Sequence, residues 1–266
     1  KAFTSLIIYS IYLSRLLLLM RRLTLFVFMK INSFLNYSDY LDTIVNKIMS
    51  QIRVNEKTLI GIATGFSPTK IYSLIGEKLK NEPELRAKIY IFQLDEWKGV
   101  SVNEKNSCHY YIINNVIVPW KLDIKNCFMI DGLTFEDENQ LIKYQKYLIK
   151  KSLDICILGI GENGHLALNE PGTKKNQLFG IQKLSSASLN HAMLEKSKQL
   201  ITHGISIGIK EIMDSKEVIL LISGENKQQT YESFITKKDY NSFPASILHN
   251  HQNCSTFIDP DTINLS

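Results

Sequence analysis

The segment from Leu153 to Gly172 constrains the fold of this chain most, because an apolar strand runs directly into a turn crowded with glycine. The run Ile155 to Leu158 is short and bounded by glycine, which is typical of a central parallel strand covered on both faces. Glycine adopts positive φ without steric cost, so this turn can bend sharply and approach a ligand closely. Reactive side chains follow at the carboxyl end of the strand, where open α/β sheets bind ligands: Glu162, Asn163, His165, Asn169 and Glu170.

Apolar strands alternate with amphipathic helices from Met29 onward. The spacing predicts helices over residues 37–52, 67–79, 110–118, 136–152 and 209–213, and strands over 58–63, 89–94, 155–158 and 218–222. Strands separated by helices imply βαβ units. We therefore predict an α/β fold of Rossmann-like type, in which a three-layer, open, mostly parallel sheet carries helices on both faces. Residues 29–266 contain no internal repeat or linker and are expected to form a single domain.

Charge and cysteine content argue against several classes of protein. Residues 1–28 hold four basic residues and no acid, which leaves only +1 of the net charge of +5 for residues 29–266. No basic patch with interleaved aromatic residues remains, so we expect no nucleic-acid partner. The cysteines form no CxxC pair: Cys108, Cys127, Cys156 and Cys254. This spacing is typical of reduced thiols in a cytoplasmic protein and supports neither a disulfide framework nor a zinc site.

Residues 1–28 are apolar and basic, and they differ from the rest of the chain. They resemble a membrane segment, but Arg15 within the span is costly and no small-residue cleavage site follows. Met29 stands directly before the amphipathic part of the chain. We expect residues 1–28 to be an extension outside the functional domain, such as an upstream start, and not a membrane tether.

The turn after the first predicted strand is rich in glycine, threonine and serine and leads into a helix. Backbone N–H groups, hydroxyls and the positive end of the helix dipole could hold a phosphate there, with residues 64–67 as the candidates. The alternative is that Ser67, ahead of Pro68, only caps the helix. The turn has neither the GK[ST] ending of a Walker loop nor a GxGxxG fingerprint, which argues against nucleotide binding.

Two further loops place charged residues at the same edge of the predicted sheet. Asp95 and Glu96 directly follow the second strand, and a partly shielded carboxylate there could act as a general base with a raised pKa. Taken alone, Asp95 could instead be a helix cap or a surface acid. Lys227 follows the strand over 218–222, so its ammonium could reach a phosphate held by residues 64–67, or it could be a solvated surface lysine.

Several motifs, in this order and spacing, resemble the amino-sugar phosphate deaminase/isomerase family. They are Thr64-Gly-Phe-Ser-Pro, Leu94-Asp-Glu-Trp, Gly161-Glu-Asn-Gly-His-Leu-Ala-Leu-Asn-Glu-Pro-Gly and Gly224-Glu-Asn-Lys. The likeness covers residues 29–259. Within the family, the galactosamine-6-phosphate branch is most similar over Cys156-Ile-Leu-Gly-Ile-Gly-Glu-Asn-Gly-His, Gly204-Ile-Ser-Ile-Gly-Ile-Lys-Glu-Ile and Phe243-Pro-Ala-Ser-Ile-Leu.

This resemblance implies an aldose-ketose isomerisation of a small sugar phosphate, coupled to loss of ammonia and without a metal or a redox cofactor. It places Asp95 on the family's general base, which moves a proton between C2 and C1 through an enolamine. His165 falls on the residue that opens the sugar ring, and Glu170 on the acid that supports and orients it. The implied phosphate-binding positions are Thr64, Gly65, Phe66 through its backbone, Ser67 and Lys227.

The sequence departs from the glucosamine-6-phosphate members of the family at two places. Asn163 stands where they carry an aspartate beside the catalytic histidine, and an amide cannot raise imidazole basicity as a carboxylate does. Glu162 and Glu170 are the candidates to compensate. The segment from Lys174 to Leu194 lacks the arginines that grip phosphate and effector in those enzymes, so we expect no effector control of that kind. His191 is either a partial replacement or a structural residue.

Three classes of function follow from these observations. The first is deamination of galactosamine 6-phosphate to tagatose 6-phosphate, or otherwise of glucosamine 6-phosphate to fructose 6-phosphate. The second is hydrolysis of a 6-phosphogluconolactone, which is disfavoured because Asn169-Glu-Pro-Gly is a deaminase-type continuation. The third is a non-enzymatic sugar-phosphate sensor, which predicts a helix-turn-helix module that residues 1–36 do not show. The sequence leaves the C4 configuration of the sugar and the oligomeric state open, and it is compatible with a homo-oligomer.

Overall fold

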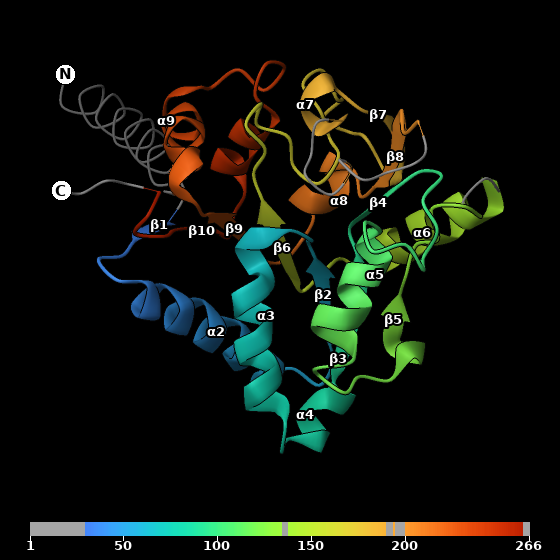
Figure 1. The fold of residues 1–266 in the computed structure, drawn as a ribbon, viewed down its shortest axis with the longest axis vertical. Helices are drawn as coiled ribbons and strands as arrows, with labels where there is room; N and C mark the ends of the chain where they lie inside the picture. Colours follow the sequence, from blue (N-terminus) through green and yellow to red (C-terminus); the bar gives the residue numbers. More distant parts are fainter. Residues whose placement is uncertain (1–29, 135–137, 190–193, 195–199, 263–266) are drawn as a thin grey trace, which may run out of the picture.

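The structure is a computed structural model that describes residues 30–134, 138–189, 194 and 200–262 (Figure 1). The strands are β1 (Lys30–Ser33), β2 (Thr58–Ile62), β3 (Ile89–Gln93), β4 (Asp95–Trp97), β5 (Cys127–Phe128), β6 (Ile155–Gly159), β7 (Gly180–Lys183), β8 (His203–Ser206), β9 (Val218–Ile222) and β10 (Cys254–Ile258). The α-helices are α2 (Tyr37–Val54), α3 (Phe66–Leu79), α4 (Pro83–Ala87), α5 (Cys108–Ile112), α6 (Glu138–Lys150), α7 (Ser186–Leu189), α8 (Ile209–Met213) and α9 (Gln228–Thr236). Shorter turns of other helix types are η1 (Ile113–Ile117), η2 (Ile124–Asn126), η4 (Glu225–Lys227) and η5 (Pro244–Asn250).

Seven parallel strands form the main sheet, in the order β1-β10-β9-β6-β2-β3-β5. Ile60 of β2 is in register with Ile91 of β3 on one side and with Ile155 of β6 on the other. From β2 the chain moves outward to β3 and β5, and from β6 it moves the opposite way to β9 and β10. This arrangement confirms the predicted open, mostly parallel α/β sheet. It also makes the carboxyl edge between β2 and β6 a topological switch point, where such sheets bind ligands.

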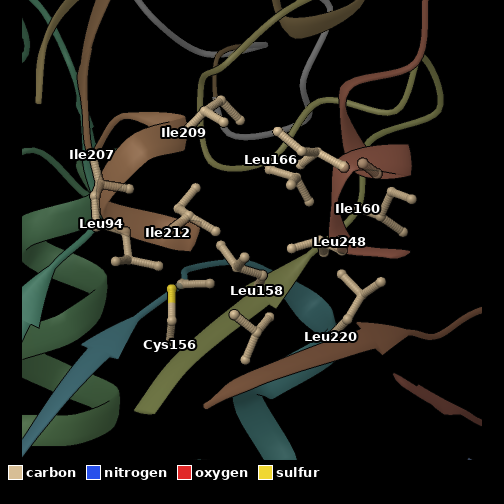
Figure 2. Packing of buried hydrophobic residues seen from close by; sticks show 14 of the residues in the cluster. Leu94, Cys156, Leu158, Ile160, Leu166, Ile207, Ile209, Ile212, Leu220 and Leu248 are labelled. Carbon is tan, nitrogen blue, oxygen red and sulfur yellow. The ribbon is translucent and has the colours of Figure 1, made fainter. Parts of the chain in front are cut away.

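Alternate residues of the central strands face opposite helical layers, because successive side chains of a strand point to opposite faces. Ile157 and Leu221 belong to the core that the sheet forms with the apolar stripes of α2 and α3. Leu158 and Leu220 belong to the core on the other face, which includes residues of α8, α9 and η5. Figure 2 shows these two leucines with Ile209 and Ile212 of α8 and Leu248 of η5. The central strands contribute buried apolar side chains to both cores, so their sequences are continuous apolar runs and not alternating ones.

A second, antiparallel sheet has the strand order β4-β8-β7 and was not predicted. Its strands are three or four residues long, which is too short for an alternating pattern to stand out in the sequence. In it, Asp95 is in register with Ser206, and Trp97 with Gly204. Because β4 follows β3 after one residue, this small sheet holds Asp95 at the carboxyl edge of the main sheet.

The predicted bounds agree with the structure for α8 and β9, and they differ by one to a few residues elsewhere. The largest difference is in the helix predicted over 110–118, because α5 ends at Ile112 and is followed by the π-helix η1. Helix α5 also begins two residues earlier, at Cys108, where Ser107 caps it by accepting a hydrogen bond from the Tyr110 amide. The expected extension over residues 1–28 lies outside the described residues, as do positions 136 and 137 of the predicted helix over 136–152. No helix in the described part of the chain is long and apolar enough to cross a membrane.

Candidate active site

Loops that follow β2, β3, β6 and β9 line a cavity of about 490 Å³ at the switch point of the main sheet. Most of the predicted site residues line this cavity: Thr64, Gly65, Phe66, Ser67, Asp95, His165 and Lys227. The other two, Asn163 and Glu170, adjoin His165: Asn163 Oδ1 lies 2.8 Å and Glu170 Oε2 lies 3.8 Å from its Nδ1. The structure therefore brings loops that are far apart in the sequence to one place, as predicted. The roles of these residues stay predictions.

The loop after β2 presents the start of α3 to the cavity. Gly65 precedes the helix with a φ of +104°, a left-handed conformation that favours glycine, and it makes no side-chain cap. The Tyr111 hydroxyl donates to the Gly65 carbonyl at 3.0 Å, and the Thr69 hydroxyl donates to the same carbonyl at 2.8 Å. The alternative in which Ser67 caps the helix is wrong, because Ser67 lies inside the first turn of α3. The first N–H groups of a helix have no partner within it, so this braced turn can hold an anion.

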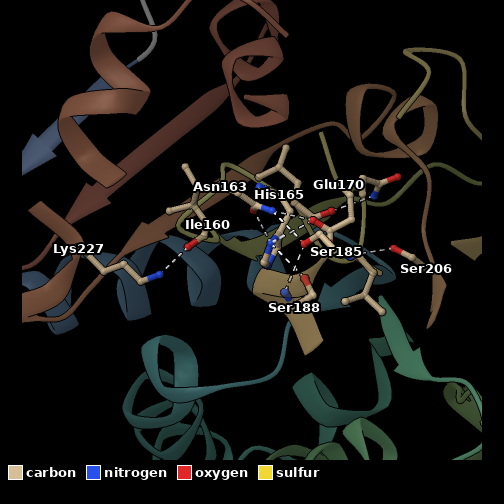
Figure 3. A network of polar contacts seen from close by, with 11 residues as sticks. Ile160, Asn163, His165, Glu170, Ser185, Ser188, Ser206 and Lys227 are labelled. Carbon is tan, nitrogen blue, oxygen red and sulfur yellow. Dashed lines mark hydrogen bonds and ion pairs between the residues drawn. The ribbon is translucent and has the colours of Figure 1, made fainter. Parts of the chain in front are cut away.

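Lys227 reaches the cavity from the loop after β9. Its Nζ donates to the Ile160 carbonyl at 3.0 Å (Figure 3), and the side chain is half-buried. Burial lowers the pKa of Lys227, and the nearby charge of Glu162 partly opposes this effect. The alternative of a solvated surface lysine is therefore wrong. A half-buried ammonium in the same cavity as the start of α3 suits a negatively charged group.

Asp95 stands at the start of β4, with its Oδ1 buried. Burial raises the pKa of Asp95 to about 7, the charge of Glu96 adds to the rise, and a hydrogen bond from Cys108 opposes it. A carboxyl group with a pKa near neutrality can both take and return a proton, which is what a general base in an isomerisation must do. The alternatives of a helix cap and of a surface acid are both wrong for Asp95, because it lies in a strand and lines the cavity.

Glu96 does not share the position of its neighbour, although the sequence predicted both acids at the rim. It is fully buried and accepts hydrogen bonds from several donors around the start of α5. These donors are the amides of Trp97, Cys108 and His109, the Ser107 hydroxyl and the Gln93 side chain, at 2.7 to 3.2 Å. Burial raises the pKa of Glu96, and the hydrogen bonds from the amides and the hydroxyl lower it. Adjacent residues of a strand point to opposite faces, which separates the two carboxylates.

His165 is oriented by Asn163, which is in turn held by Glu170 (Figure 3). Asn163 Oδ1 accepts from the backbone amide of His165 at 3.1 Å and lies 2.8 Å from its Nδ1. Asn163 Nδ2 donates to Glu170 Oε2 at 2.8 Å. An amide oxygen can only accept, so Nδ1 carries the proton and the neutral imidazole keeps its basic lone pair on Nε2.

Glu170 supplies the carboxylate of this network, at 3.8 Å from His165 Nδ1. Burial alone would raise the pKa of Glu170, but hydrogen bonds from Ser188, Asn163 and the Ser185 amide hold it below its usual value. Glu170 is therefore ionised at neutral pH and polarises the Asn163 amide. Of the two candidates to compensate for the missing aspartate, the structure favours Glu170, because Glu162 lies near Lys227 instead.

The turn after β6 needs glycine at the position that faces the imidazole. A Cβ placed on Gly161 would overlap three ring atoms of His165. The hydrogen bond from the Gly161 amide to the His165 carbonyl, at 3.1 Å, closes the turn around this ring. Gly161 of the sequence motif therefore makes room for the His165 ring.

Sequence reasoning missed the residues that surround these groups. The sequence indicated only a reduced thiol at Cys108, yet this residue lines the cavity next to Asp95. Ser185 and Ser188 hold Glu170, and no local pattern marks them. His191 lies outside the described residues. Across the described ranges, no group of three His, Cys, Asp or Glu side chains could hold a metal ion.

The fold and the site together define the class of protein: an enzyme with an open α/β sheet, whose cavity brings the start of a helix together with a carboxyl group, an imidazole and a lysine. The model of the glucosamine-6-phosphate isomerase/6-phosphogluconolactonase family matches residues 37–257. The chain belongs to this family, which confirms the resemblance stated from the motifs and the prediction that the protein is an enzyme.

Curated relatives and solved structures agree with this assignment. The chain is 33% identical to a glucosamine-6-phosphate deaminase of Clostridium acetobutylicum over 87% of its own length and 97% of the relative's. It is 30% identical to the putative deaminase AgaI of Escherichia coli over 82% and 87%. A monomeric glucosamine-6-phosphate deaminase of the NagB superfamily matches 90% of this chain and 100% of its own, with a TM-score of 0.82 and 26% identity. A 6-phosphogluconolactonase from Trypanosoma brucei, at a TM-score of 0.70 and 18% identity, shows the same fold.

Proposed function

We propose that this protein converts a hexosamine 6-phosphate and water into a ketose 6-phosphate and ammonia. The observation that carries the proposal is the meeting of three kinds of group in one cavity. The braced start of α3 and Lys227 suit the phosphate, Asp95 has a pKa near neutrality, and His165 presents a basic nitrogen. A fixed anion site gives leverage for placing the far end of the sugar against the acid-base groups.

The proposed reaction begins with ring opening. Nε2 of His165 takes the proton from the C1 hydroxyl and delivers it to the ring oxygen, so that the bond between C1 and the ring oxygen breaks and the aldehyde forms. Asp95 then removes the C2 proton and returns it to C1 through an enolamine, while the C1 oxygen gains a proton and the amine loses one, so that C1 carries a hydroxyl and C2 an imine. Water adds to that imine and ammonia leaves, which gives the ketose phosphate. Every step is a proton transfer or an addition of water, so the chemistry requires no electron carrier.

We assign galactosamine 6-phosphate as the preferred substrate, with tagatose 6-phosphate as the product. The support is the similarity of the motifs that begin at Cys156 and Gly204 to the galactosamine-6-phosphate branch, together with Asn163 in place of an aspartate. Glucosamine 6-phosphate is the second candidate, because several of the most similar relatives are named glucosamine-6-phosphate deaminase. The two sugars differ only in the orientation of the hydroxyl at C4.

One assay tests both parts of the proposal. Each hexosamine 6-phosphate is supplied separately, and ammonia is measured together with the ketose phosphate by enzymatic coupling or mass spectrometry. We expect equal amounts of ammonia and ketose phosphate, with a higher kcat/KM for the galactosamine compound. Hydrolysis of a 6-phosphogluconolactone without ammonia release would point to the other branch of the family. No ammonia from either hexosamine 6-phosphate would overturn the proposed function.

A further inference from the structure

A buried thiol lies where the base and the phosphate loop meet. Cys108 is 2% exposed and lines the same cavity as Asp95 and Thr64. The Thr64 hydroxyl donates to Cys108 Sγ, with the two atoms 3.5 Å apart. The thiol itself donates to the Asp95 carboxylate, which lowers the pKa of that carboxyl. One side chain therefore touches both the loop that would hold the phosphate and the group that would move the proton.

The helix that carries this thiol is fixed at both sides of the cavity. Glu96, the residue after Asp95, accepts hydrogen bonds from the Cys108 amide at 3.0 Å and the His109 amide at 2.7 Å. One turn further, the Tyr111 hydroxyl donates to the Gly65 carbonyl at 3.0 Å. Helix α5 thus joins β4 to the start of α3, and the position of Cys108 follows from contacts at each end.

The thiol is a neutral hydrogen-bond donor and not a nucleophile. Burial raises the pKa of Cys108 well above its usual value, and the charges of Glu96 and Asp95 raise it further. A thiolate, which is the reactive form of cysteine, is therefore disfavoured at neutral pH. A protonated S–H can only assist the neighbouring carboxylate by donating to it.

We propose that Cys108 is a positioning residue for Asp95, whose carboxyl group its thiol holds in register with the loop over residues 64–67. The inference rests on the proposed function and deepens it, because it adds a residue that acts on the base without touching the reacting atoms. The alternative role for this sulfur is only to fill space beneath the cavity. The variant Cys108→Ser distinguishes the two roles, because serine keeps a hydrogen-bond donor at this position but has a smaller side chain than cysteine.

The test measures the ionisation of Asp95 directly, without turnover. Aspartate carboxyl carbons are labelled with ¹³C and titrated by NMR in the full chain, and the Asp95→Asn protein identifies the Asp95 signal. The variants are Cys108→Ala and Cys108→Ser, with Cys127→Ala as a control cysteine in β5, away from the cavity. Circular dichroism melts check that each variant is folded.

We expect the midpoint of Asp95 to rise in Cys108→Ala by about half to one pH unit, the usual effect of one lost hydrogen bond. The ionised fraction at pH 6, and with it kcat/KM at that pH, should then fall about three- to tenfold. Cys108→Ser should restore most of the difference, and Cys127→Ala should not change the midpoint. An unchanged midpoint in Cys108→Ala, or an equal rise in Cys108→Ala and Cys108→Ser, would overturn the inference.

The same experiment separates this inference from the proposed function. If the unaltered protein releases no ammonia from either hexosamine 6-phosphate, the proposed function fails, whatever the titration shows. If turnover is observed but the Asp95 midpoint does not respond to Cys108→Ala, the function stands and the role of the thiol fails.

Discussion

The unaltered protein should lose folding stability as the pH rises, because Asp95 ionises, and replacing Asp95 by asparagine should remove this loss. The stability of Asp95→Asn relative to the unaltered protein should therefore be greater at alkaline pH than at acid pH. The pKa of Asp95 is about 7 in the folded protein, against an ordinary value of 3.8. Between these two values the folded state binds more protons than the unfolded state, so folding stability falls as the pH rises. This sign is opposite to that of the usual salt-bridged aspartate, whose stabilising effect is lost as the pH falls.

The expected magnitude follows from the two pKa values. Above pH 7 the buried carboxylate lowers the free energy of unfolding by about 4 kcal/mol. Of this decrease, about 2 to 3 kcal/mol occurs between pH 5 and pH 8. Asparagine does not titrate, so Asp95→Asn lacks this loss. The difference in unfolding free energy between variant and unaltered protein should therefore grow by about 2 to 3 kcal/mol from pH 5 to pH 8.

Urea unfolding at fixed ionic strength, followed by circular dichroism at pH 5 and pH 8, measures this difference. Asp42→Asn is a suitable control, because Asp42 is an exposed carboxyl on α2, far from the cavity in the fold. Its difference from the unaltered protein should stay constant between the two pH values. A difference for Asp95→Asn that is equally constant would refute the raised pKa and, with it, the argument for Asp95 as the base.

Further outcomes are expected for the site residues. The kcat/KM of deamination should rise with pH through about 7 as Asp95 ionises. The Asp95→Asn protein should bind substrate without converting it, and turnover by that variant would remove Asp95 from the mechanism. Gly161→Ala should lower kcat/KM by about 100-fold, because the added methyl displaces the His165 ring. Gly180→Ala, where a Cβ would meet no atom closer than 3.6 Å, should retain activity, and equal loss in both variants would contradict the steric argument. Lys227→Ala should weaken binding of inorganic phosphate by about 10- to 100-fold in calorimetry, and unchanged affinity would count against a phosphate contact.

The architecture was largely predictable because its signals are local. Val218 to Ile222 forms a buried strand, and Ile209 to Met213 forms a helix, at the residues that the apolar pattern indicated. The small antiparallel sheet was not predictable, because β4 and β8 acquire their structure by pairing with each other and carry no pattern of their own. Short strands of this kind depend on partners that are distant in the sequence.

The candidate site was also only partly predictable from the sequence. The motif that contains Gly161 and His165 marked a functional turn, because it combines glycines, which permit a sharp bend, with an imidazole at the carboxyl end of a strand. The partners of Glu170 were not visible, since Ser185 and Ser188 belong to a segment with no motif. The sequence also did not show that Asp95 lines the cavity whereas Glu96 is buried, because this depends on which side of β4 faces the cavity.

The sequence by itself determined the family, the central parallel strands with several of their helices, and the loops that hold the candidate groups. These properties depend on residue type and spacing along the chain. Only the tertiary structure decided which carboxylate enters the cavity, why the pKa of Asp95 lies near 7, and that Cys108 contacts that carboxyl. The physical reason is that desolvation and hydrogen bonding act through space, between loops that parallel strands bring to a common edge of the sheet.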